Sequence, residues 1–310
     1  MQKVSRRVFL QGFSVFCVVG CGRKLEAVDL IDHHWSGIGF GIPMSAELYQ
    51  FDPASMKSLR FEELIQQLEL AFSLYNDASE VSVLNRERVL RDPSAVFLKV
   101  LELARELSVR TEGYYQPAIH KAWMAMEEGE LSDAMLAAAT MDNVAVSEAA
   151  VRLRDPLIEV SFNALIQGYL TDHVAQHLRT LGVKSALLHF GESYGVGQHP
   201  EQRPWELAVM GTPVGEQVDL VGTMRFEDAG LAVSTHDSTR KLLNPKRGEA
   251  QIENRVVAVV SEEGAAVADA FATAFTVAPS QYWPKLYQNL IVRRSGAVKI
   301  WEENTLVFEA

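Results

Sequence analysis

The sequence predicts an α+β fold in which mixed sheets are packed against helices. Apolar residues recur at helical spacing over residues 55–75, 93–111 and 164–181, and short apolar or alternating stretches of strand length lie between these segments. The two kinds of element do not alternate regularly, as they do in a doubly wound sheet, and this favours α+β. No repeat, low-complexity tract or internal linker interrupts the chain after its first 35 residues.

The first residues predict a signal peptide of the twin-arginine type. Arg6 and Arg7 precede an apolar run, residues 13–20, that is far shorter than the roughly 20 residues of a membrane-spanning helix. Val18-Val19-Gly20-Cys21 is typical of a lipobox, in which the Cys21 thiol receives a diacylglycerol that anchors the mature chain. We therefore expect a leader over 1–20, a tether over 21–35, and a domain over 36–310 held at the inner membrane on its periplasmic side.

The remaining elements follow in order from periodicity and turn residues. A strand is expected from Gly37 to Tyr49, and Gly113 and Gly182 end the second and third of the helices named above. A hairpin over 144–161 is expected to turn at Arg154-Asp155-Pro156. The other expected elements are a short helix at 131–140, strands at 185–190, 205–210, 230–234 and 255–260, a helix at 265–275 and a closing hairpin at 290–308.

Composition excludes some classes of function. The formal net charge is −11, and removal of Lys3, Arg6 and Arg7 with the leader takes it to −14, so no basic stripe is available for nucleic acid. The two cysteines are Cys17, inside the leader, and Cys21, so the mature chain can form no intramolecular disulfide. Twin-arginine export commonly carries proteins that fold around a cofactor first, which makes a cofactor a reasonable expectation.

The most informative local feature is Ala268-Asp269-Ala270-Phe271-Ala272-Thr273-Ala274. Asp269 and Thr273 are four residues apart, on one face of a helix, and both side-chain oxygens can reach one hard cation. A carboxylate and a hydroxyl suit Mg²⁺, which prefers oxygen ligands and often shares them with phosphates. The alternative is ordinary packing, with Asp269 as a cap and Thr273 as a core-facing hydroxyl.

A second feature is the junction Ser161-Phe162-Asn163-Ala164, where a strand ends and a helix begins. Backbone amides and carbonyls at such a corner can face a phosphate or a metal. The simpler interpretation is that Asn163 caps the helix and Gly168 permits close packing. Tyrosines in two turns, at Tyr75 and at Tyr114-Tyr115, can stack on a flat ring or be half-buried.

Taken in order, these segments resemble the FAD:protein FMN transferase (ApbE) family along nearly the whole mature chain. The Ala-Asp-Ala-x-x-Thr-Ala signature at 268–274 is matched in full and is the most specific segment. The other matched residues are Gly41, Ser73, Tyr75, Ser79, Glu80, Leu84, Asn85, the turn from Gly113 to Pro117, Trp123, the helix start from Ala164 to Tyr169, Asp172, Gly182, Gly191 and Trp205.

The resemblance implies an ApbE-like, T-fold-like architecture and an enzyme that moves FMN from FAD onto a Thr or Ser of a target protein, releasing AMP. The implied acceptor is a flavoprotein subunit of a membrane electron-transfer system. A metal would neutralise charge on the diphosphate; Asp269 and Thr273 would supply side-chain ligands to Mg²⁺ and Ala164 a backbone carbonyl. The implied FAD site comprises Phe40, Tyr75, Tyr114, Tyr115, Gln116, Ser161, Gln167 and Leu243.

Three departures from the family pattern bear on catalysis. Lys241 stands where the family has a histidine, Gln116 replaces an aspartate, and Gln167 replaces a common lysine. Lys241 and the nearby His236 are therefore the candidates for proton transfer. Because glutamine keeps hydrogen bonding but loses charge, two alternatives stay open: a flavin-binding lipoprotein without transferase activity, and a pyrophosphatase that splits FAD with water.

Overall fold

The computed structural model describes residues 33–49, 59–147, 149–212, 218–237, 241–249 and 254–310. Its centre is an eight-stranded antiparallel sheet in the order β1-β2-β6-β7-β10-β13-β14-β15. These strands are β1 His33–Gly39, β2 Ile42–Tyr49, β6 Ser185–His189, β7 Ser193–Val196, β10 Ala229–His236, β13 Arg255–Ser261, β14 Gly296–Glu302 and β15 Thr305–Glu309. The α+β prediction is confirmed.

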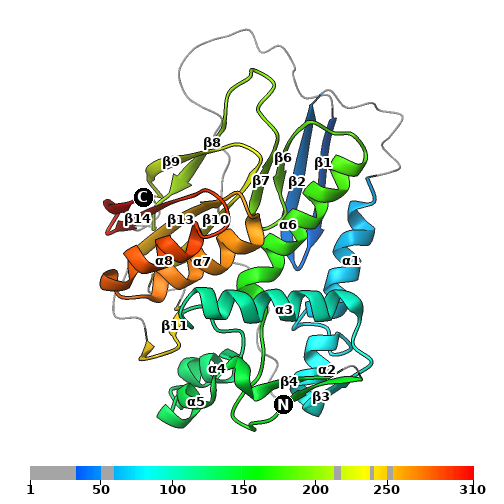
Figure 1. Ribbon diagram of the computed structural model, residues 1–310, viewed down its shortest axis with the longest axis vertical. Coiled ribbons are helices and arrows are strands. Elements are labelled where there is room, and N and C mark those ends of the chain that lie inside the picture. Colours follow the sequence, from blue (N-terminus) through cyan, green and yellow to red (C-terminus); the bar gives the residue numbers. More distant parts are fainter. Residues whose placement is uncertain (1–32, 50–58, 148, 213–217, 238–240, 250–253) are drawn as a thin grey trace.

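One face of the sheet is covered by helices (Figure 1). The helices α1 Phe61–Phe72, α6 Asn163–Thr180, α7 Ala265–Val277 and α8 Trp283–Leu290 share one core with the inward side chains of the sheet. Along β13, Val257 and Val259 point into this core because side chains alternate along a strand. The helix α7 is apolar on nearly all sides, as is expected of a helix enclosed on every side.

The opposite face of the sheet carries a separate hairpin and its own smaller core. The strands β8 Trp205–Met210 and β9 Leu220–Phe226 pair antiparallel. Trp205 and Phe226 of this hairpin share the smaller core with residues of the sheet, which include Val256, Ala258 and Trp301. The hairpin therefore covers the side chains of β13 that alternate away from the helices.

A second group of elements lies below the helical layer in Figure 1. It comprises α2 Glu80–Glu87, α3 Ala95–Arg110, α4 His120–Glu128, α5 Asp133–Ala138 and the small sheet β3-β5-β4, with β3 Val89–Arg91, β4 Val144–Val146 and β5 Ala150–Leu153. A two-stranded ribbon, β11 Leu243–Asn244 and β12 Gly248–Glu249, lies near α4 and α5. Among the described helices, none is both long enough and apolar enough to cross a membrane.

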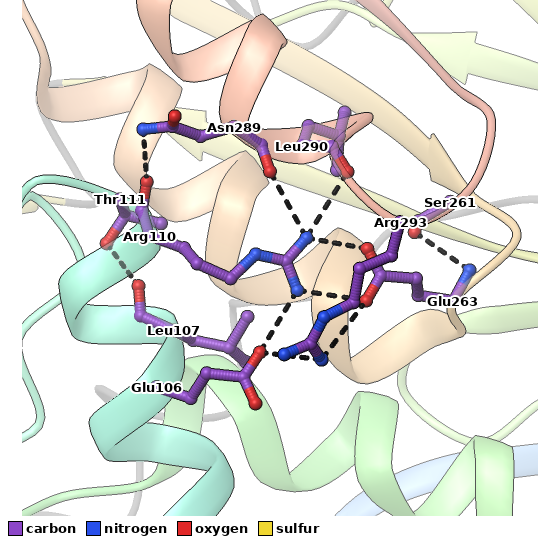
Figure 2. A network of polar contacts seen from close by, with 9 residues as sticks. All are labelled: Glu106, Leu107, Arg110, Thr111, Ser261, Glu263, Asn289, Leu290 and Arg293. Atoms are coloured by element: carbon purple, nitrogen blue, oxygen red, sulfur yellow. Dashed lines mark hydrogen bonds and ion pairs between the residues drawn. The ribbon is translucent and has the colours of Figure 1, made fainter.

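Arg110, at the end of α3, joins this lower group to the helical layer (Figure 2). Its guanidinium donates to both carboxylate oxygens of Glu263, at 2.6 and 2.9 Å, and to the backbone carbonyls of Asn289 and Leu290. Glu106 accepts a further hydrogen bond from it at 3.2 Å. A bidentate pair of this kind fixes orientation as well as distance, so α3 is held against the start of α7 and the end of α8.

Several expected elements differ from the structure. The single strand expected over 37–49 is the β1–β2 hairpin, which turns at Phe40 and Gly41, both with positive φ (51° and 79°). The β4–β5 hairpin turns at Ser147, where the Ser147 N–H and hydroxyl donate to the Ala150 carbonyl. Its expected turn at Arg154 to Pro156 is therefore wrong, because the bend there follows the end of β5. The strand β1 begins at His33, inside the expected tether, whereas the expected leader and Cys21 lie outside the described residues.

Candidate functional site

The candidate site is built where α6 crosses α7. Gly168 makes the close approach possible, because a Cβ there would lie 2.4 Å from the Ala265 carbonyl oxygen. Any side chain at 168 would push the two helices apart. The Gly168 backbone also bonds the Asp269 carboxylate, so the contact places the start of α6 beside Asp269.

Asp269 is a buried carboxylate with incomplete hydrogen bonding. It is 7% exposed, and its Oδ2 has no hydrogen-bond partner. Burial raises its pKa well above the usual value, the Gly168 backbone lowers it, and the charge of Asp172 raises it further. A buried anion without compensation is strongly unfavourable, so this oxygen is poised for a cation or a proton.

The two other residues expected to hold the cation, Thr273 and Ala164, lie on α7 and at the start of α6. Thr273 lies one turn further along α7, half-buried. Ala164 has non-helical backbone angles (φ −90°, ψ 32°) inside the first turn of α6, which turns its peptide away from the regular helical direction. The cap is not Asn163, because α6 begins with that residue and Ser161 Oγ accepts from its N–H at 3.3 Å.

The aromatic turn that precedes α4 packs against this corner. The Ser161 N–H donates to the Pro117 carbonyl at 2.9 Å. Tyr115 is 2% exposed, its hydroxyl has no hydrogen-bond partner, and burial followed by the charge of Asp269 raises its pKa well above the usual value. Gln116 is turned inward, since it donates weakly to Ser108 Oγ (3.4 Å) and accepts from the Ala118 N–H (3.3 Å).

A second buried acid, Glu192, approaches from the turn between β6 and β7. It is 5% exposed, and the charge of Asp269 adds to burial in raising its pKa well above the usual value. Gly191 (φ 99°) lets this turn lie against Gln167, because a Cβ at 191 would meet Gln167 Cβ at 2.6 Å. Gln167 is thereby buried between α6 and the sheet.

His236 and the residues from Lys241 to Lys246 contact α4 and the end of α7. The Leu242 N–H donates to His236 Nδ1 at 3.1 Å, and Trp123 Nε1 donates to the Lys241 carbonyl at 3.0 Å. Asn244 Nδ2 bonds the Val277 carbonyl at the end of α7 at 2.7 Å. Lys246 Nζ lies 4.2 Å from the centre of the Tyr114 ring, within the range of a cation–π interaction.

The other expected FAD-site residues occupy two further places. Leu243 is buried in β11, next to Asn244. The Phe40 N–H, in the β1–β2 turn, donates to Glu69 on α1 at 2.6 Å, and Tyr75 follows the end of α1 with 59% of its surface exposed. The structure thus joins Tyr115, Gln116, Ser161, Ala164, Gln167 and Asp269 around the α6–α7 crossing, with Phe40 and Tyr75 at α1.

The donor set fits a hard cation rather than a cluster of strong ligands. Within the described ranges, no group of three or more His, Cys, Asp or Glu side chains is arranged to hold a metal. The site instead offers the orphaned Asp269 oxygen, the Thr273 hydroxyl and the displaced Ala164 peptide. Oxygen donors of mixed type are the set that Mg²⁺ accepts, with water or phosphate completing it.

Two residues of this region, Glu192 and His120, were not predicted from the sequence as candidate functional residues. Glu192 gave no signal, because its place beside Asp269 depends on how the sheet packs on the helices. His120, at the start of α4, is stacked near Trp123 at 6.3 Å, and burial lowers its pKa to about 4. Its position directly after the aromatic turn was a sequence signal that could have identified it.

Comparison with known proteins gives a consistent result. The model of the ApbE family matches residues 40–294. A curated FAD:protein FMN transferase of Rhodobacter capsulatus is 27% identical over 219 residues, which make up 63% of this chain and 41% of that protein. The chain therefore spans less than half the length of this relative.

Solved structures share the fold. The flavinyl transferase ApbE of Pseudomonas stutzeri, in its apo form, has a TM-score of 0.72 at 20% identity, covering 90% of this chain and 93% of that one. The flavin transferase ApbE of Vibrio cholerae has a TM-score of 0.70 at 18% identity, covering 90% and 96%. At these identities the likeness establishes the architecture alone.

Proposed function

Because this chain belongs to the ApbE family, we propose that it transfers FMN from FAD to a threonine or serine hydroxyl of an acceptor protein and releases AMP, in a reaction that depends on Mg²⁺. The observation that carries the proposal is Asp269, a buried carboxylate with an unpartnered oxygen at the α6–α7 crossing. The curated relative is named for the same transfer.

In the proposed reaction, the acceptor hydroxyl oxygen forms a bond to the phosphorus of the FMN half of FAD. The P–O bond to the AMP half breaks, and AMP leaves with the bridging oxygen. Asp269, Thr273 and the Ala164 carbonyl would hold Mg²⁺, which when bound supplies neutralisation of the diphosphate charge. The protein residues orient the diphosphate and exclude water through the buried turn at Tyr115.

Proton transfer from the acceptor is assigned to Lys241 rather than His236. Since the Leu242 N–H donates to His236 Nδ1, the neutral ring carries its proton on Nε2 and can only donate from that atom. Lys241 replaces the histidine of the family pattern, and histidine is the side chain that most often acts as a general base. We therefore expect FMN transfer by this protein to be slower than transfer by an enzyme that has the histidine.

The FAD-binding role proposed for the tyrosines is supported by their arrangement. Tyr114 is buried beside Lys246 and Tyr282, whose ring centre lies 5.5 Å away. Tyr75 presents an exposed ring at the end of α1, suited to stacking on a flat ligand.

The localisation proposed for this protein is the inner membrane, anchored through Cys21 and facing the periplasm, with a membrane electron-transfer subunit as acceptor. Replacement of Cys21 by serine should release the protein from the membrane fraction into the soluble periplasmic fraction. Retention of Cys21→Ser in the membrane fraction would contradict the anchor.

The test of the function is incubation of the protein with FAD, Mg²⁺ and a candidate acceptor domain, following AMP and the acceptor mass together. AMP release with a mass gain of one FMN supports the transferase. AMP release without an acceptor would instead indicate a pyrophosphatase. Tight FAD binding with neither product, across several acceptors, would indicate a flavin-binding lipoprotein.

A further inference from the structure

We infer that Glu192 supplies a second carboxylate to the cation site beside Asp269, so that the divalent cation is held by two buried acids from different elements. The inference rests on the proposed function, because the cation is the one that the proposed transfer requires. It concerns Glu192 alone, which the sequence pattern did not single out.

The backbone of Glu192 is fixed against the first turns of α6. Thr171 Oγ1 donates to the Gln167 carbonyl at 2.8 Å and lies 3.3 Å from the Glu192 carbonyl. Gly191 lies directly against the Gln167 side chain. Gln167 is the neighbour of Gly168, whose backbone bonds Asp269, so Glu192 and Asp269 reach the same stretch of α6.

The Glu192 carboxylate is buried with little to satisfy it. Among the described residues, its hydrogen bonding consists of one long contact, from the Val233 N–H to Oε2 at 3.3 Å. Two other buried polar atoms of the same region, Asp269 Oδ2 and the Tyr115 hydroxyl, have no hydrogen-bond partner. Unpartnered polar atoms that are this deeply buried are rare in folded proteins and indicate a missing partner.

The electrostatic surroundings favour a cation as that partner. The charge of Asp269 acts unfavourably on Glu192, and the groups that act on these two acids include no lysine or arginine. Asp172 is a useful contrast, since both of its oxygens accept backbone N–H groups and Arg179 lies within electrostatic reach. Both oxygens of Asp172 are therefore used in hydrogen bonds to α7, while Glu192 and Asp269 retain oxygens for a ligand.

Two carboxylates in place of one raise the affinity for a divalent cation, since affinity in oxygen-ligand sites follows the number of charged ligands. The competing explanation is a proton shared between the two acids, as in other close carboxylate pairs. A shared proton needs no metal, so direct measurement of cation binding separates the two explanations.

The experiment is a titration of the full-length protein with Mn²⁺ in place of Mg²⁺, without FAD, in which free Mn²⁺ is measured by electron paramagnetic resonance. Glu192→Gln keeps the size of the side chain and removes its charge, and we expect it to raise the Mn²⁺ dissociation constant by about 10- to 100-fold. Glu192→Asp, which keeps the charge, should bind more tightly than Glu192→Gln. Glu201→Gln, the same change at an exposed position, should bind as the wild type does.

The outcomes separate this inference from the proposed function. If Asp269→Asn loses Mn²⁺ while Glu192→Gln binds within about twofold of the wild type, Glu192 is not a ligand and the proposed function is unaffected. If the wild-type protein binds no Mn²⁺, the cation site of the proposed function fails as well. Thermal unfolding of each variant without metal verifies that lost binding does not reflect lost folding.

Discussion

The Asp172 carboxylate accepts the backbone N–H of Ala265 at 2.6 Å, although the two residues are 93 positions apart. The Ala266 N–H donates to the other oxygen at 2.9 Å. An acidic side chain of α6 thus serves as the N-terminal cap of α7. A negative charge at this position interacts favourably with the positive end of the helix dipole. Since α7 carries Asp269, this cap fixes the position of the candidate cation site.

The pH dependence of stability tests this cap. Burial raises the pKa of Asp172 to about 7, despite its two backbone hydrogen bonds. Between the unfolded value near 3.8 and this value the native protein binds more protons than the unfolded chain. The free energy of unfolding should therefore fall as pH rises from about 4 to about 7, by on the order of 1 kcal/mol per pH unit from this group.

Asp172→Asn should lack that component, because asparagine does not titrate. Urea unfolding in the presence of a chelator, at several values of pH across this window, measures both slopes. Equal slopes in the wild type and in Asp172→Asn would contradict the assignment.

Asp269→Asn should remove the response to Mg²⁺ and lower the rate of flavin transfer by at least about 100-fold, because the variant lacks the charged ligand proposed for the cation. The metal-free variant should be no less stable than the wild type at about pH 8, since the buried charge is gone. Calorimetry with and without Mg²⁺ measures the stability and its response to Mg²⁺, and single-turnover transfer measures the rate. Mg²⁺ stabilisation equal to that of the wild type would exclude Asp269 as a ligand.

Gly168→Ala should destabilise the protein by roughly 1–3 kcal/mol or more, because the added Cβ would lie 2.4 Å from the Ala265 carbonyl oxygen. The matched control is Gly129→Ala, where a Cβ meets nothing within 4 Å and only the positive φ of 74° is unfavourable. Denaturant unfolding compares the two variants. A larger loss for Gly129→Ala would show that the α6–α7 contact tolerates a methyl group.

Arg110 and Glu263 should be strongly coupled in stability. Their side chains are 11% and 10% exposed and are joined by two hydrogen bonds, so removing either partner leaves a largely buried charge and should be destabilising by about 3–5 kcal/mol. Replacing both residues by methionine should be less destabilising than the sum of the single changes. A double-mutant cycle measures this coupling, and additive effects would contradict it.

Lys241→His should accelerate transfer by roughly 10-fold or more, because it restores the imidazole of the family pattern, the side chain that most often acts as a general base. The rate of the variant should rise with pH through about 6.5. Single-turnover transfer to an acceptor at saturating FAD measures the change. Unchanged or slower transfer across this range would mean that the side chain at 241 does not take part in proton transfer.

Much of the fold was accessible from local sequence patterns. The helices α1, α3, α6 and α7 and the strands β6, β8 and β13 lie close to their expected ranges, because each combines a periodic apolar pattern with a clear end. The helices α2, α4 and α8 were missed. They have only eight or nine residues, too few turns to establish helical periodicity.

Features that repeat within one element could be predicted from the sequence. The four-residue spacing of Asp269 and Thr273 on α7, and the glycine that allows the approach at 168, follow from helical geometry and side-chain size. The ends of elements were predicted less accurately, as the misplaced turn between β4 and β5 shows, because many residues are compatible with a turn.

Contacts between residues far apart in the chain could not be predicted from local sequence and are established by the packing of the fold. The Asp172 cap on α7, the burial of Glu192 beside Asp269 and the contact of Trp123 with the Lys241 carbonyl each join elements far apart in the chain. Local periodicity specifies which face of an element is apolar. How those faces pack, and hence which polar groups are buried together without partners, depends on long-range packing of the whole core.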